Sequence, residues 1–167
     1  MNIIDELEWR GAINQQTDAE GLYKLVDKKS ISLYCGIDPT GDSMHIGHLI
    51  PFMILKRFQL AGHHPVILIG GGTGAIGDPS GRTTERVLQT AEQVKHNADS
   101  LTAQMKKLFG EDGSFTMMNN YDWLSKISLL DFLRDYGKLF NINTMLAKDV
   151  VASRLETGIS FTEFSYQ

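Results

Sequence analysis

Two histidines three residues apart stand out in the stretch DPTGDSMHIGHL, residues 38–49. The spacing of His45 and His48 puts both side chains on one side of a helical turn, where they can touch one ligand together. Gly47 between them adds no bulk, so a flat ring or a sugar can lie against the backbone. The free N–H groups at the start of such a helix attract anions, and the Thr40 hydroxyl adds a donor. The combination indicates a nucleoside triphosphate site.

Two other interpretations of the histidine pair remain open. The pair could bind zinc, although the sequence offers no third or fourth ligand at a suitable spacing, which argues against a protein-bound metal. It could also consist of two ordinary residues on a helix surface, because short motifs match by chance. A second glycine-containing loop further along the chain favours the nucleotide site.

That second loop is GGGTGAIGDPSGR, residues 70–82, and it contains a misleading pattern. Gly72 to Gly77 fit G-x-G-x-x-G after a strand, as in dehydrogenases that bind a dinucleotide. The Asp78 carboxylate would repel the phosphates, however, while Pro79 and Gly81 interrupt the helix that the pattern requires. The further strand that ends in an acidic residue is also missing. The sequence therefore argues against a dehydrogenase.

Three further residues near the loops each have two interpretations. Asp78 can hold the ammonium group of an amino acid, or it can form a turn before Pro79. Tyr34 can donate its hydroxyl in a pocket, or it can be a core aromatic residue. Cys35 can contact a ribose hydroxyl, or it can be an ordinary small strand residue.

The elements around these loops predict how they are positioned. Residues 31–37 and 66–70 are apolar runs that predict buried strands, and residues 45–62 between them predict a helix ended by Gly62. A strand, a helix and a strand in this order form a βαβ unit with parallel strands. Both loops then meet at the carboxyl edge of the sheet, where open α/β sheets bind ligands.

The rest of the chain predicts more helices and one more strand. Residues 2–10 predict a helix. A capping-box pattern that begins at Thr17 predicts a second helix, with Leu22, Leu25 and Val26 on its inner side. A similar pattern at Thr90 predicts a third helix, which covers the sheet. A strand is expected at 115–118, and helices at 128–137 and 141–155. His63 and His64 are expected in solvent, and Trp9 and Trp123 as packing anchors. Ser160 opens a last helix that has barely begun at Gln167, so we expect a fragment cut inside a helix.

Composition sets the limits of these interpretations. The 167 residues, 42% of them hydrophobic, suit one soluble domain, and the net charge of -4 shows no basic footprint of nucleic-acid binding. No apolar run is long enough to cross a membrane, so no membrane partner is expected. The single cysteine and the absence of an export signal favour a cytoplasmic location.

With these motifs assembled, the sequence resembles the N-terminal part of bacterial tyrosyl-tRNA synthetases, which are class I aminoacyl-tRNA synthetases. The resemblance covers essentially the whole chain. It runs from ELEWRG through LYCGIDPTGDSMHIGHL, GGGTGAIGDPSGR and NNYDWL to FLRDYGK and GISFTEFSY. The HIGH motif alone would also fit nucleotidylyltransferases, whereas YCGIDPT and GDPSG make the resemblance specific.

The resemblance implies an α/β fold, the Rossmann-like parallel sheet with flanking helices of an incomplete class I catalytic domain. Residues 1–30 would form an N-terminal helical segment, and residues 31–167 the first part of the catalytic domain. The activity implied is tyrosine-tRNA ligase: L-tyrosine and ATP give tyrosyl-adenylate and pyrophosphate, and the tyrosyl group passes to tRNA(Tyr). ATP is a substrate that carries Mg²⁺, with no protein-bound metal. The family is dimeric, with an interface that draws on residues around 130–165 and beyond.

The resemblance also implies roles for individual residues. Thr40 and His45 would contact the γ-phosphate and the departing pyrophosphate. The ribose side would be contacted by His48, Gly47 and Cys35, and the junction of the two substrates would be lined by Asp38 and Gly36. Tyr34 would bind the phenolic hydroxyl, and Asp78 would help hold the amino group. The catalytic residues would be Thr40, His45 and His48.

The implied reaction needs neither a catalytic base nor a covalent intermediate. A carboxylate is already a nucleophile, so the site has to supply positioning and charge stabilisation. The remaining tyrosine-pocket residues, the KMSKS loop and the tRNA-reading region would follow Gln167. We therefore expect these 167 residues alone to be catalytically incomplete. A nucleotidylyltransferase, or a non-catalytic fragment that binds ATP or tyrosine, remains an alternative.

Overall fold

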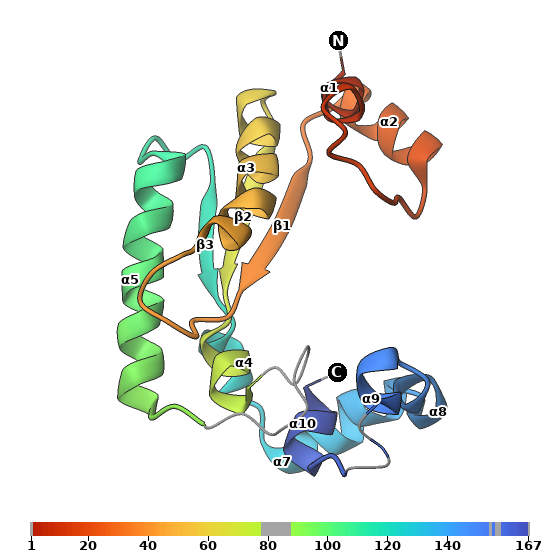
Figure 1. Cartoon of the computed structure of the whole chain (residues 1–167), viewed down its shortest axis with the longest axis vertical. Coiled ribbons are helices and arrows are strands. Elements are labelled where there is room, and N and C mark those ends of the chain that lie inside the picture. Colours follow the sequence, from red (N-terminus) through yellow and green to blue (C-terminus); the bar gives the residue numbers. More distant parts are fainter. Residues whose placement is uncertain (1, 78–87, 154, 156–157, 167) are drawn as a thin grey trace. The chain divides into compact units, whose positions relative to one another are not determined.

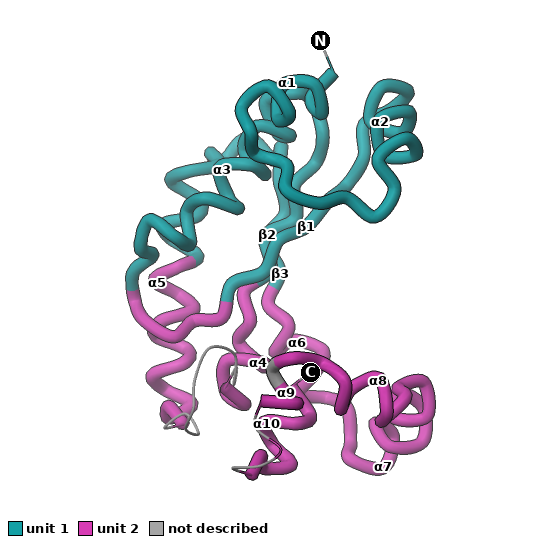
Figure 2. The backbone as a smooth tube through the Cα atoms, turned by 45° about the vertical axis from the view of Figure 1, so that its right-hand side comes forward, with its two compact units in different colours: residues 1–37, 43–68, 102–118 teal, residues 38–42, 69–101, 119–167 magenta. Residues whose placement is uncertain are grey.

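The computed structural model describes residues 2–77, 88–153, 155 and 158–166 of the chain. Contacts divide the chain into two compact units, coloured separately in Figure 2. The first unit comprises residues 1–37, 43–68 and 102–118, and the second comprises residues 38–42, 69–101 and 119–167. The N-terminal helices group with most of the three strands in the first unit. The boundary expected at residue 30 remains a prediction.

Three strands are interspersed with helices through the first two thirds of the chain (Figure 1). In chain order these elements are α1 (Ile3–Trp9), α2 (Ala19–Lys28), β1 (Ser32–Ile37), α3 (Ile46–Leu60), β2 (His64–Ile69), α4 (Gly71–Ile76), α5 (Ala91–Phe109) and β3 (Thr116–Asn119). Short helices follow: α6 (Tyr121–Leu124), α7 (Leu129–Asp131), a π-helical turn η1 (Phe132–Tyr136), a 3₁₀ turn η2 (Gly137–Leu139), α8 (Ile142–Leu146), α9 (Asp149–Ala152) and α10 (Phe161–Ser165).

The strands form one sheet in the order β1-β2-β3, and their arrows point the same way in Figure 1. Helix α3 connects β1 to β2 and packs against β1, as a βαβ unit requires. The parallel sheet with flanking helices confirms the predicted α/β class. In β2 every second residue is buried, whereas β1 buries only Ile37. The prediction of a buried first strand is therefore wrong in the described chain, because β1 lies at the edge of the sheet.

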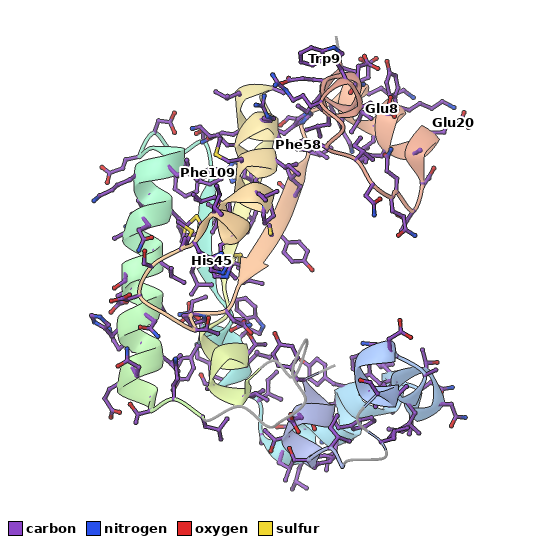
Figure 3. The ribbon with its side chains drawn as sticks, viewed as in Figure 1. Glu8, Trp9, Glu20, His45, Phe58 and Phe109 are labelled. Atoms are coloured by element: carbon purple, nitrogen blue, oxygen red, sulfur yellow. The ribbon has the colours of Figure 1, made fainter. Side chains whose placement is uncertain are left out.

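The two N-terminal helices share a core with the end of α3. Phe58 of α3, labelled in Figure 3, packs among buried residues of α1 and α2. The other buried members of this cluster are Ile3, Ile4, Leu7 and Val26. Leu22 packs against it, but Leu25 is 40% exposed, so only part of the predicted inner face is correct. Helix α2 also begins one residue later than expected, since Asp18 rather than Thr17 caps it.

His63 is buried between α3 and β2, where the sequence predicted a solvated residue. Its Nδ1 accepts the Ile31 N–H at 3.3 Å, and its ring lies 5.5 Å from that of Phe58. His64 bonds to the Thr116 hydroxyl at 2.8 Å. Trp9 and Trp123 are 77% and 40% exposed, so their prediction as packing anchors is also wrong. Neither could be placed correctly from the sequence, because a tryptophan in a helix does not reveal which face is covered.

In the last third of the chain one predicted helix forms and one is broken. Residues 129–139 are helical throughout, as α7, the π-helical turn and the 3₁₀ turn, so the helix expected at 128–137 is confirmed. Extended backbone at Lys148 divides the helix expected at 141–155 into α8 and α9. The capping box of α10 forms as predicted: Ser160 Oγ accepts the Glu163 N–H, and the Glu163 side chain accepts the Ser160 N–H. No helix among the described residues is long and apolar enough to cross a membrane.

Candidate functional site

The predicted site residues fall into two groups, one in each unit. The first unit holds Tyr34, Cys35, Gly36, His45, Gly47 and His48, and the second holds Asp38 and Thr40. Asp78 lies outside the described residues. Each group is therefore described by itself.

The two imidazoles stack on each other at the start of α3. His45, labelled in Figure 3, precedes the helix with extended backbone, and His48 follows in the first turn. The ring centroids are 3.6 Å apart and the ring planes differ by 24°. His45 is exposed and His48 is half-buried. The spacing in the sequence thus brings the two rings together, as predicted.

Gly47 is what leaves room for this stacking. A Cβ at position 47 would lie 3.0 Å from Cε1 and 3.1 Å from Nδ1 of His45, which is closer than a side chain normally approaches. The sequence suggested that the glycine makes space for a ligand. In the structure it makes space for the ring of His45, which is exposed.

The stacked pair favours a neutral His48. Burial lowers the pKa of His48, and the positive charge that His45 can carry lowers this pKa further by repulsion. Its Nδ1 is buried without a hydrogen-bond partner among the described residues. A neutral imidazole keeps one N–H donor and one acceptor nitrogen, so it suits a hydroxyl or another polar group better than a second cation.

Three predicted residues follow one another in β1. Tyr34 is 73% exposed, which excludes the alternative that it is a core aromatic residue in the described chain. Cys35 is half-buried, and burial raises the pKa of its thiol. The sulfur therefore remains protonated as a weak donor rather than a reactive thiolate. Gly36 is exposed and has room for a side chain, since a Cβ there would meet Leu68 only at 3.7 Å.

In the second unit, both carboxylate oxygens of Asp38 are held. The Thr73 hydroxyl donates to Oδ1 at 2.6 Å, and the Tyr166 hydroxyl donates to Oδ2 at 2.7 Å. Asn120 Nδ2 in turn donates to Thr73 Oγ1 at 3.0 Å. Position 70 must be glycine, because a Cβ there would collide with the Asp38 carboxylate. Sequence reasoning missed Thr73, Asn120 and Tyr166, and no local signal links them to Asp38.

The second glycine-rich loop forms helix α4, whose first N–H groups are already occupied. Gly71 N–H donates to Asn119 Oδ1 at 3.2 Å, and Gly72 N–H donates to Asn120 Oδ1 at 2.7 Å. The helix ends after six residues at Gly77, where φ is +89°. A dinucleotide-binding motif needs those N–H groups for the pyrophosphate. This geometry supports the argument against a dehydrogenase.

A cavity of about 440 Å³ lies elsewhere in the second unit. It is bordered by α4, by the N-terminal half of α5 and by α6, with Gly71, Val94 and Tyr121 among its lining residues. None of the predicted site residues that the structure describes lines it. Among the described residues, no three His, Cys, Asp or Glu side chains are grouped as a metal ion would need. The expected absence of a bound metal remains a prediction.

Comparison with known proteins identifies the family. Residues 26–167 match the family of tRNA synthetases class I (W and Y). Tyrosine-tRNA ligase 1 of Enterococcus faecalis is 80% identical over 167 residues, which are the whole of this chain and 40% of the relative. The tyrosine-tRNA ligase of Latilactobacillus sakei is also 80% identical, over 99% of this chain and 40% of its own length.

Solved structures agree with these relatives. A C-terminally truncated mitochondrial tyrosyl-tRNA synthetase of Aspergillus nidulans superposes with a TM-score of 0.85 at 34% identity, covering 99% of this chain and 51% of that one. The corresponding protein of Coccidioides posadasii gives 0.80 at 33% identity, covering 99% of this chain and 48% of that one. This chain spans about two fifths of the length of the curated relatives it matches. It belongs to the class I tRNA synthetases of the tryptophan and tyrosine group.

Proposed function

We propose that this chain forms the first part of the catalytic domain of a tyrosine-tRNA ligase. The complete enzyme would join L-tyrosine to ATP as tyrosyl-adenylate, release pyrophosphate, and transfer the tyrosyl group to tRNA(Tyr). The observation that carries the proposal is the 80% identity to tyrosine-tRNA ligases over the whole chain. The stacked imidazoles at the start of α3 and the restrained Asp38 carboxylate support it.

The proposed chemistry is an in-line attack of the tyrosine carboxylate on the α-phosphorus of ATP. The bond from phosphorus to the β-phosphate oxygen breaks, and pyrophosphate leaves. No proton has to move, so the residues act through positioning and charge stabilisation. His45 and Thr40 would bind the phosphates more tightly in the pentacovalent transition state than in ground-state ATP, which raises the rate of the chemical step. Mg²⁺ enters as part of the Mg–ATP substrate.

The other site residues would orient the two substrates. Neutral His48 would exchange a hydrogen bond with a polar group on the ribose side, with Gly47 and the protonated Cys35 beside it. Gly36 and Asp38 would lie at the junction of ATP and tyrosine. The two hydroxyls that donate to Asp38 fix its carboxylate and leave acceptor capacity on both oxygens for a substrate group.

Tyrosine itself would be bound at both of its ends. Tyr34 would bind the phenolic hydroxyl, and its exposed position on β1 leaves its own hydroxyl accessible. Asp78 would help hold the ammonium group. We also propose that the complete enzyme is a cytoplasmic homodimer.

The experiment needs the complete enzyme. It can be obtained as the full-length protein that carries this sequence, or by joining residues 1–167 to the remaining part of the Enterococcus faecalis relative. Tyrosine-dependent exchange between ATP and pyrophosphate is the expected activity. Exchange that depends on a different acceptor would instead support a nucleotidylyltransferase. No exchange with tyrosine or with any other acceptor would support a non-catalytic fragment that binds ATP or tyrosine. The 167 residues alone should show no aminoacylation.

The division of labour is tested by His45→Ala and Thr40→Ala. Each should lower the single-turnover rate of adenylate formation by about 100-fold or more, with little change in tyrosine affinity. A variant that mainly weakens the ground-state affinity for ATP would contradict the proposed transition-state role.

A further inference from the structure

Two side-chain amides of the second unit hold the loop that carries Thr40, and a third amide from the same stretch bonds to one of them. We call Gln89, Gln93 and Asn97 the amide clamp. Asn97 lies in α5 and is only 1% exposed. Its Nδ2 donates to the Pro39 carbonyl at 3.0 Å, and Gln89 Nε2 donates to the Thr40 carbonyl at 2.9 Å. Two successive carbonyls of the loop are therefore held by side chains of the clamp.

The members of the clamp also hold one another. Asn97 Nδ2 donates a second bond to Gln89 Oε1 at 3.2 Å, and Gln93 Nε2 donates to Asn97 Oδ1 at 2.9 Å. Asn97 thus uses both its donor group and its carbonyl oxygen. A buried amide with its polar groups satisfied is costly to replace, because its partners lose their hydrogen bonds.

The loop has little freedom of its own at this point. Pro39 is fully buried and fits against Gly74, where a Cβ would lie 2.9 Å from Pro39 Cδ. Thr40 N–H donates to the Asp38 carbonyl at 2.8 Å, which makes a tight turn. The Thr40 residue itself is exposed. The backbone of Thr40 is therefore held by Pro39 and by the clamp, while its side chain remains accessible to a ligand.

We propose that Asn97 and Gln89 are positioning residues that fix the Thr40 backbone for phosphate binding. The inference rests on the proposed function, because it assigns the clamp to the step in which Thr40 contacts the phosphates of ATP. In this proposal the clamp acts on the substrates only through Thr40. It restricts the conformations of the loop before the transition state forms. The clamp should therefore raise the rate of adenylate formation rather than the affinity for the substrates.

The test is a double-mutant cycle in the complete enzyme. Gln89→Ala removes the bond to the Thr40 carbonyl at a half-buried position, so the variant keeps its core. It should slow single-turnover adenylate formation by about fivefold while tyrosine affinity stays unchanged. In a Thr40→Ala background the same change should slow the reaction by less than about twofold, because the group that it positions is gone. Equal slowing in both backgrounds, or none in either, overturns the proposal.

Asn97→Leu provides the second arm, because it replaces the amide by an apolar group of similar shape. It should slow adenylate formation by about tenfold and accelerate hydrogen exchange of the backbone amides of residues 40–44. Val94→Ala is the matched control, since it removes buried volume from the same helix but none of the hydrogen bonds to the loop. It should change neither the rate nor that exchange. Unchanged exchange in Asn97→Leu overturns the proposal.

These outcomes separate the two proposals. An unmodified enzyme without tyrosine-dependent exchange of ATP and pyrophosphate refutes the proposed function, and the catalytic role of the clamp with it. If the unmodified enzyme is active but the effects of Gln89→Ala and Thr40→Ala are additive, only the positioning role of the clamp is refuted. Lys95→Gln, which breaks the exposed pair of Lys95 with Asp99 on the same helix, should leave the rate unchanged and exclude a general effect of altering α5.

Discussion

Gly47 allows the two imidazoles to stack because it has no side chain in the space that the His45 ring occupies. Gly47→Ala would put a methyl group against the His45 ring, so the two imidazoles could no longer stack as they do. Alanine is the better helix former by about 0.5–1 kcal/mol, so the variant should be no less stable than the original. We expect adenylate formation to slow by about tenfold, with unchanged tyrosine affinity, in single-turnover measurements on the complete enzyme.

Gly137→Ala is the matched control for this prediction. Among the described residues, a Cβ at position 137 would meet only the Phe132 carbonyl, at an ordinary 3.6 Å. It should leave the rate unchanged. If Gly47→Ala proves as fast as the unmodified enzyme, the stacked arrangement of the rings has no part in catalysis.

His63 predicts how stability changes with pH. Burial lowers the pKa of His63 in the folded chain, whereas an unfolded histidine titrates near its usual value of about 6.5. Above that pH both states are neutral. Below it the unfolded chain binds the proton more readily, so the free energy of unfolding falls by at most about 1.4 kcal/mol per pH unit for this residue. His48, whose pKa is also lowered, adds an effect of the same sign.

His63→Asn separates the two histidines, since Oδ1 of asparagine can replace Nδ1 as the acceptor for the Ile31 N–H. Urea unfolding at pH 7.5 and 5.5 should show a smaller loss of stability for the variant than for the original protein. Equal losses would mean that His63 does not titrate in this range.

At the scale of elements, Asn2 caps α1 and also links it to α2. Asn2 Oδ1 accepts the Ile4 N–H at 2.9 Å, Asp5 Oδ2 accepts the Asn2 N–H at 3.0 Å, and Asn2 Nδ2 donates to the Tyr23 carbonyl of α2 at 3.1 Å. Asn2→Ala removes both bonds of the Asn2 side chain, the one to the Ile4 N–H and the one to the Tyr23 carbonyl. We expect the free energy of unfolding to fall by about 1–2 kcal/mol in urea titrations.

Asn14→Ala serves as the comparison, because Asn14 is an exposed residue of the loop between the two helices. It should change stability by no more than about 0.5 kcal/mol. A loss in Asn2→Ala as small as this would show that α1 is held by its buried face alone.

Elements with strong local signals were predictable from the sequence. The glycine after α3, the apolar run of β2 and the capping box of α10 each act within a few residues. Helices α3 and α10 formed where they were expected, and β2 began two residues earlier, at His64. The stacking of His45 on His48 belongs to the same class, since it depends on spacing within one turn.

Features that depend on distant partners were not predictable. Tyr166 reaches Asp38 across 128 positions, and Asn97 reaches Pro39 across 58. Neither residue differs in type from many others, so only the fold reveals its contact. The helix expected at 141–155 failed for a similar reason: its apolar residues suited a helix pattern, while the extended backbone at Lys148 that divides it into α8 and α9 follows no proline or other strong signal.

At the scale of the whole molecule, the segment of residues 129–142 exposes an unusual amount of apolar surface. Leu130 and Leu139 are 77% and 73% exposed. The other exposed large hydrophobic members of the segment are Leu129, Phe132, Leu133, Tyr136, Phe140 and Ile142. Burying one leucine contributes about 1.5–3 kcal/mol, so this surface favours association, and it lies in the region expected to form the dimer interface.

The proposed homodimer gives the last prediction. In a two-fold interface each substitution occurs twice, so Leu130→Glu with Leu139→Glu would place four carboxylates in the contact. Sedimentation velocity should show the unmodified complete enzyme as a dimer and the double variant as a monomer. Leu60→Glu, at a leucine that is 76% exposed at the end of α3, is the matched control and should stay dimeric. If the double variant also stays dimeric, the interface lies outside residues 129–142, because a buried unpaired charge costs more than the contact of a leucine contributes.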